Sequence, residues 1–151
     1  MKLEGDNCIC EFTFCEKLDD GGFAKYRNML SSRRGSFLID SPVFFTKRDL
    51  CLFLDFFQKL ITRPGFSICV PEDQSFLPLE ADFTIIYPAK LNLLECHKTT
   101  THVMLSCLIA CWLPSKRYQF GISDWFPIES VNQFISDIAK ELQLRYNTCP
   151  R

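Results

Sequence analysis

Apolar residues alternate with other residues along several short stretches of the chain, a pattern typical of strands that bury one face. In residues 102–113 one apolar row consists of Val103, Leu105, Cys107, Ile109, Cys111 and Leu113. Near the N-terminus a second row consists of Cys8, Cys10, Phe12 and Phe14. Because four of the nine cysteines fall in these rows, we expect most cysteines to be reduced and buried in a hydrophobic core.

Further strands are predicted where short apolar runs are bounded by turn residues. With the two stretches above, the predicted strands cover residues 8–15, 36–45, 66–70, 82–87, 91–96, 102–113 and 117–122. Short connections between consecutive strands favour antiparallel pairing. Pro42 either weakens the strand over 36–45 or places it at a sheet edge, since proline cannot donate a ladder hydrogen bond.

A first helix is predicted after Thr46, which can cap it. Asp49 lies three residues on, where its carboxylate can reach back to the cap, and Phe45 and Leu50 occupy the positions of a hydrophobic staple. Pro64-Gly65 ends the helix. Its apolar stripe consists of Leu50, Phe53, Leu54, Phe57, Leu60 and Ile61.

This helix has a wider apolar stripe than a half-exposed helix needs. Cys51, Leu52 and Phe56 extend the stripe on its flanks. Either a sheet and a loop cover the helix together, which we favour, or a partner protein covers it.

A second helix is predicted from near Pro127 to about Tyr146. Its buried stripe consists of Val131, Phe134, Ile135, Ile138, Ala139 and Leu142. The order of elements is therefore strands, helix, a run of strands, helix. This order predicts one α+β domain over residues 1–151, an antiparallel sheet of about six to seven strands with two helices packed on one face.

Composition and charge exclude several classes of protein. The 151 residues are 47% hydrophobic with fifteen phenylalanines, so a folded core is expected. A formal net charge of −1 argues against a general nucleic-acid binder, which carries a basic excess. The N-terminus does not read as a secretory signal, and the longest weakly polar stretch is about half of the ~20 residues that a membrane-spanning helix needs. We expect a cytoplasmic protein without membrane association.

Motifs for catalysis and for cofactor binding are missing from the sequence. It contains no Gly-x-Ser-x-Gly, no phosphate-binding glycine loop and no Cys-x-x-Cys. A metal cluster of Cys96, His97, His102 and Cys107 across a hairpin is the alternative to core and surface roles, which we favour. We therefore predict no enzymatic activity, no cofactor and no metal.

Acidic residues concentrate in two segments. Residues 1–20 contain six acidic residues and two lysines, and residues 71–82 contain acidic residues without a basic one. Acidic loops suit a basic protein partner, because complementary charge speeds encounter. Asp19, Asp20, Glu72 and Asp73 are therefore candidate contacts, and an evenly solvated surface is the alternative interpretation.

The segment RGSFLIDSPVFFTKRDLCLFLDFFQKL resembles the core of the small bacterial immunity proteins paired with wall-associated contact-dependent toxins, the WapI-type immunity family. The shared pattern is a Gly-Ser-Phe strand, a short connection and a helix of the type T-x-x-(D/E)-L-x-x-F-x-x-x-L. The opening MKLEGDNCICEFTF and the ending, YQFGIS followed by a helix, are also similar. The segment DDGGFAKYRNMLSS and the abundance of cysteine depart from this pattern. The resemblance implies a cytosolic protein that docks on a toxin domain and blocks its active site, with no catalytic residues of its own.

Two functions follow from the sequence. The first is an immunity-type protein-binding module, as a monomer or homodimer, whose partner is a cognate toxin domain. The second is a small-ligand-binding or enzymatic α+β domain with a pocket between sheet and helices that uses His97 or His102. A neighbouring toxin gene would favour the first, and a deep polar pocket enclosing a histidine would favour the second.

Overall fold

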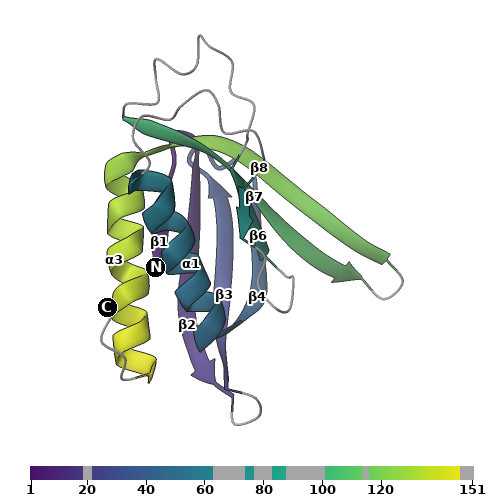
Figure 1. The fold of residues 1–151 in the computed structure, drawn as a ribbon. Helices are drawn as coiled ribbons and strands as arrows, with labels where there is room; N and C mark the ends of the chain where they lie inside the picture. The colour runs from purple at the N-terminus through teal and green to yellow at the C-terminus, as the bar shows by residue number, and fades with distance from the viewer. Residues whose placement is uncertain (19–21, 63–73, 77–82, 88–100, 114–115, 147–151) are drawn as a thin grey trace.

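A computed structural model describes residues 1–18, 22–62, 74–76, 83–87, 101–113 and 116–146, with side chains described for all of these except 74–76, 83–87, 107–113 and 116–122. The first half holds β1 (Lys2–Glu4), β2 (Cys8–Lys17), β3 (Phe23–Ser32), β4 (Leu38–Thr46) and α1 (Lys47–Thr62). The second half holds β5 (Gln74–Phe76), β6 (Phe83–Tyr87), β7 (His102–Leu113), β8 (Lys116–Pro127) and α3 (Ile128–Tyr146) (Figure 1).

The strands of the described segments form two antiparallel sheets of four strands each. The first sheet has the order β1-β2-β3-β4 and the second has the order β5-β6-β7-β8. The fold class is α+β with antiparallel sheets, as predicted, but the expectation of one sheet of about six to seven strands is wrong. Among the described strands, β1 lies near β8 but pairs in a ladder only with β2.

Most predicted strands overlap an observed one, and β3 is the main omission. Within β3 the inward row contains Ala24 and Asn28 between larger apolar residues, so its alternation is weak in the sequence. The predicted strands over 66–70 and 91–96 lie outside the described residues. Pro42 lies in β4, which is the edge strand of the first sheet, so the edge position is confirmed.

The alternation seen in the sequence separates a buried face from a wetter one. Cys8, Cys10 and Phe12 of β2 are at most 1% exposed, and Val103 and Leu105 of β7 are fully buried. Cys15 is exposed, as is Cys51 of α1, so two of the four cysteines with described side chains are buried and two are exposed. The side chains of Cys107 and Cys111 lie outside the described residues, so their core placement stays a prediction.

The predicted capping box begins α1. The Thr46 N–H and hydroxyl donate hydrogen bonds of 2.8 and 2.7 Å to Asp49 Oδ2, and the Asp49 N–H donates to Thr46 Oγ1 at 3.1 Å. These reciprocal bonds satisfy amides that the first turn would otherwise leave without partners. The helix begins at Lys47, directly after the cap, which confirms the predicted start.

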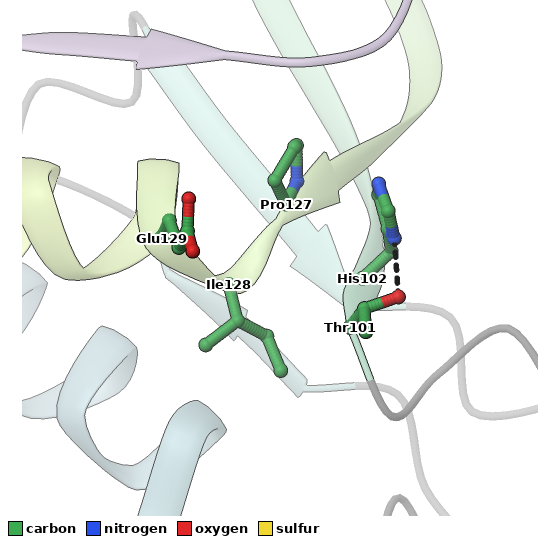
Figure 2. A pocket seen from close by; sticks show the side chains of 5 residues that line it. All are labelled: Thr101, His102, Pro127, Ile128 and Glu129. Carbon is green, nitrogen blue, oxygen red and sulfur yellow. Dashed lines mark hydrogen bonds between the residues drawn. The ribbon is translucent and has the colours of Figure 1, made fainter.

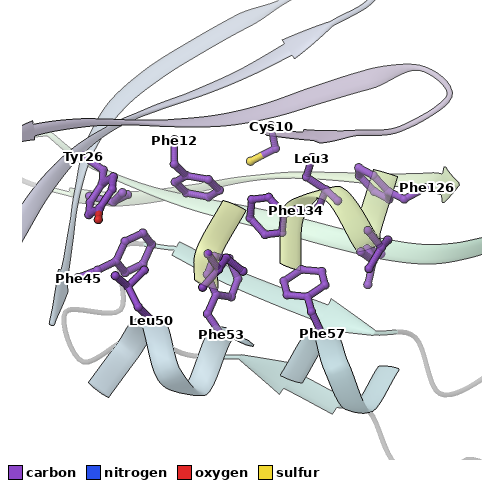
Figure 3. Close-up of a cluster of buried hydrophobic side chains, with 14 of the residues drawn as sticks. Leu3, Cys10, Phe12, Tyr26, Phe45, Leu50, Phe53, Phe57, Phe126 and Phe134 are labelled. Carbon is purple, nitrogen blue, oxygen red and sulfur yellow. The ribbon is translucent and has the colours of Figure 1, made fainter. Parts of the chain in front are cut away.

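Aromatic rings from three elements meet in the core (Figure 3). The ring of Phe12 in β2 lies 6.0 Å from the rings of both Phe53 in α1 and Phe134 in α3, measured between centroids. Phe53 and Phe134 are 5.4 Å apart in an edge-to-face arrangement. Each such pair adds about 0.5–1.5 kcal/mol beyond area burial. These rings join the two helices to each other and to the first sheet.

The second helix, α3, confirms the predicted bounds and most of the predicted stripe. It starts at Ile128, directly after Pro127, and Val131, Phe134, Ile138 and Leu142 are buried. The flank of α1 is wetter than its apolar sequence suggests, since Cys51 is exposed and Leu52 is 44% exposed. Neither α1 nor α3 combines the length and apolar character that crossing a membrane requires.

Replacing Thr46 with alanine removes the hydroxyl that bonds Asp49 in both directions. We expect Thr46→Ala to lower the free energy of unfolding by about 0.5–2 kcal/mol, measured by denaturant melts. Thr62→Ala, at the exposed end of the same helix, is the matched control and should cost less. Equal melts for Thr46→Ala and wild type would show that the cap does not stabilise the fold.

Truncating Phe53 removes a fully buried ring that contacts rings in β2, β4 and α3. Phe53→Ala should therefore lower the free energy of unfolding by about 3–5 kcal/mol. The neighbouring Leu52→Ala is the control, and its partly exposed side chain should cost clearly less. Comparable losses in the two variants would contradict the proposed core.

Candidate functional site at the junction of the two sheets

The sequence-predicted contact residues do not fall within the described structure. Asp19, Asp20, Glu72 and Asp73 lie outside the described residues, as does His97. Their role therefore stays a prediction. His102, the remaining candidate, opens β7 and lies where the two sheets meet.

The carboxylate of Asp124 joins the two sheets. Asp124 lies in β8 and is 3% exposed, and its carboxylate accepts hydrogen bonds from the Asn7 N–H at 2.7 Å and the Cys8 N–H at 2.9 Å. The Asn7 side-chain amide donates a third bond at 3.0 Å. Burial alone would raise the pKa of this carboxyl, but the hydrogen bonds from Asn7 and Cys8 outweigh it, so the pKa lies below its usual value.

The three-residue turn Gly5–Asn7, here named the junction turn, is held tightly against β8. A Cβ atom at Gly5 would overlap Asp124 Oδ2 and lie 3.1 Å from the ring of Phe126. The Asp6 N–H donates to the Trp125 carbonyl at 2.8 Å. Glycine at position 5 therefore allows the backbone to approach Asp124, and the turn presents Asp6 to solvent.

His102 lies beside the junction turn. Its Nε2 is 3.6 Å from Asp6 Oδ1, a distance for an ion pair when the imidazole is protonated, and its Nδ1 is 2.8 Å from Thr101 Oγ1 (Figure 2). The Thr101 carbonyl in turn accepts a 2.9 Å hydrogen bond from the Ile128 N–H. The start of β7 is thus tied to the start of α3.

An open pocket of about 500 Å³ lies between these two starts. Figure 2 shows the side chains that line it, from β7 on one side and from the end of β8 and the first turn of α3 on the other. They are Thr101, His102, Pro127, Ile128 and Glu129. The side chain of His102 is 31% exposed, so the pocket gives solvent access to the imidazole.

The outward face of β7 and β8 continues from the pocket. Met104 pairs with Trp125 directly beside the His102–Pro127 pair, so these four side chains share one face. Met104, Trp125 and Pro127 are partly exposed, and we name these three residues the platform. The opposite face, with Val103, Leu105 and Phe126, is buried.

Two carboxylates border this region without a Lys or Arg partner among the described residues. Asp6 has a half-exposed side chain and faces His102, and Glu129 is exposed. The nearby Glu4, by contrast, forms ion pairs with both Lys2 and Arg33. The region therefore combines an apolar platform with two carboxylates that no described Lys or Arg neutralises.

The alternative metal cluster gains no support from the described part of the chain, which holds no group of three potential metal-ligating side chains. Of its four proposed members, His102 has its ring nitrogens near Thr101 and Asp6. Cys96 and His97 lie outside the described residues, and so does the side chain of Cys107.

Sequence reasoning found His102 but missed the residues around it. His102 and Met104 are two residues apart in the alternating stretch 102–113, on the face opposite the apolar row, and this spacing is the signal that the sequence offers. Asp6 and Glu129 belong to segments far apart in the chain, and the Asp124 hydrogen bonds bring the junction turn to β8. A comparison of the chain with models of protein families finds no match, and neither does a comparison with curated proteins.

Replacing Asp124 with asparagine tests the junction. The variant places an amide where two backbone N–H groups need an acceptor, so we expect the free energy of unfolding to fall by about 1–3 kcal/mol near neutral pH. Asp6→Asn, on the neighbouring turn and half-exposed, is the control and should change stability by less than about 0.5 kcal/mol.

Wild type and Asp124→Asn should also differ in how the free energy of unfolding depends on pH. Because the pKa of Asp124 is lowered in the folded protein, its contribution is present above the pKa of the unfolded chain and is lost as pH falls through the folded value. Denaturant melts should therefore show a difference between wild type and Asp124→Asn that is steady from about pH 7 to about pH 5 and narrows as the pH falls further. A constant difference would show that ionised Asp124 does not stabilise the junction.

Proposed function

We propose that this chain is a protein-binding module of the immunity type, which docks on a toxin domain and blocks its active site. The observation that carries the proposal is the partly exposed platform of Met104, Trp125 and Pro127 beside the uncompensated carboxylates of Asp6 and Glu129. Methionine and aromatic side chains are enriched at the centres of protein interfaces. The resemblance of the strand–helix pattern to immunity proteins supports the same function.

The rigid support of the platform favours binding. Hydrogen bonds to the buried carboxylate of Asp124 fix the junction turn, and the β7–β8 ladder holds Met104 opposite Trp125. Side chains that are ordered before binding lose less conformational entropy when a partner docks. Inhibition by occlusion requires such a surface and requires no catalytic group on this chain.

The acidic loops have a second role in this proposal. Asp19, Asp20, Glu72 and Asp73 attract a basic toxin domain at long range, whereas the platform makes the close contacts. A nuclease-type toxin has a cationic active site that suits such steering. The inhibitor acts in the cytoplasm, where a toxin that enters the cell would meet its target.

A small-ligand-binding function is the second candidate, and the pocket favours it. The pocket of about 500 Å³ has a size that small molecules use, and it gives access to His102 and the Thr101 hydroxyl. Specific stabilisation of the protein against heat by one small molecule from a host extract would support this function over docking to a protein.

The test of the proposed function uses a candidate toxin domain, sought among the products of the genes next to this chain's own. We expect the wild-type chain to bind that domain and to abolish its activity at equimolar concentration. Charge reversal at Asp19, Asp20, Glu72 or Asp73 should slow association most at low salt, since salt screens exposed charges. Asp55→Lys, on the exposed side of α1, is the control for a change of net charge. Failure of the wild type to bind any neighbouring gene product would reject the immunity function.

A further inference from the structure

We infer that the pocket beside α3 receives an arginine or lysine side chain of the partner protein. This inference rests on the proposed function and identifies the chemistry by which the partner is recognised. The pocket, the platform and the two carboxylates lie together near the start of β7. The carboxylates fit the charged end of a basic side chain, and the apolar pocket wall fits its aliphatic part.

The charged end of the side chain matches Asp6 and Glu129. Among the described residues no Lys or Arg forms an ion pair with either carboxylate. Among the described residues, the basic side chains of Lys2 and Arg33 are already engaged, since both pair with Glu4 and Arg33 also donates to the Gly5 carbonyl at 2.7 Å. A guanidinium or ammonium group from a partner would therefore meet uncompensated negative charge.

The aliphatic part of the side chain matches the pocket walls. Pro127 and Ile128 supply apolar surface on the α3 side, and Figure 2 shows both lining the pocket between Glu129 and His102. Lys and Arg side chains bury their methylene stems along apolar surface while their charged ends seek polar partners. The adjoining Met104 and Trp125 then contact the residues that flank the basic side chain in the partner.

An anionic ligand fits the pocket less well. The first turn of a helix attracts anions, but Glu129 occupies that turn in α3 and already places a negative charge there. Asp6, whose carboxylate lies 3.6 Å from His102 Nε2, adds a second negative charge near the pocket. The electrostatics at this place therefore select a cation.

The first experiment tests the pocket without a partner protein. N-acetylarginine amide and N-acetylcitrulline amide have nearly the same shape, and only the first is charged. In titrations of the ¹⁵N-labelled chain, the arginine probe should shift the amide signals of Thr101, His102, Ile128 and Glu129, and these shifts should shrink in Glu129→Gln. Equal shifts with the citrulline probe, or no shifts at these residues with either probe, would overturn the inference.

The second experiment measures binding to the toxin domain. Asp6→Asn and Glu129→Gln should each raise the dissociation constant about tenfold, and the melting temperature shows whether each variant is folded. Glu16→Gln is the matched control, because its exposed carboxylate lies toward the end of β2 that points away from the start of α3 (Figure 1). It should bind like wild type.

The outcomes separate the inference from the proposed function. If wild type binds the toxin domain and both variants bind equally well, the inference is wrong and the proposed function stands. If wild type binds no neighbouring gene product, the proposed function is wrong, and the inference of a partner's basic side chain falls with it. A shift of the pocket signals by the arginine probe would then show only that the pocket selects a cation.

Discussion

The buried carboxylate of Asp124 holds together two sheets that share no backbone ladder. It accepts hydrogen bonds from the Asn7 and Cys8 N–H groups, which lie at the start of β2. A charged group at 3% exposure is tolerated because its oxygens accept three hydrogen bonds. Gly5 also lies so close to that carboxylate that a side chain at this position would overlap it.

Further contacts fix α3 at both ends against the first sheet. At its start the Ser130 hydroxyl accepts a 2.8 Å hydrogen bond from the Glu4 N–H of β1. Towards its end the Tyr26 hydroxyl of β3 donates to Glu141 at 3.3 Å, and burial raises the pKa of that phenol. These contacts hold α3 along the first sheet and place its first turn beside the start of β7, where the pocket lies.

The surface that we propose for docking is a consequence of this junction. β7 and β8 bury Val103, Leu105 and Phe126 on one face and therefore turn Met104, Trp125 and Pro127 outward. The junction turn brings Asp6 to the same side, next to His102. Binding of a basic partner would use exposed side chains that do not belong to the core. Substitutions of these side chains can therefore change recognition without changing the stability of the fold.

Local patterns in the sequence determined both helices, the capping box of Thr46 and Asp49, the inward row of β2, and the inward Val103 and Leu105 of β7. Such features depend on neighbours three or four residues apart in a helix and two apart in a strand. The division into two sheets, the strand β3 with its inward Asn28, and the candidate site were decided by tertiary structure. Asp6, Trp125 and Glu129 become one surface because Asp124 bonds to residues 117 and 116 positions earlier, and no local periodicity records a contact of that separation.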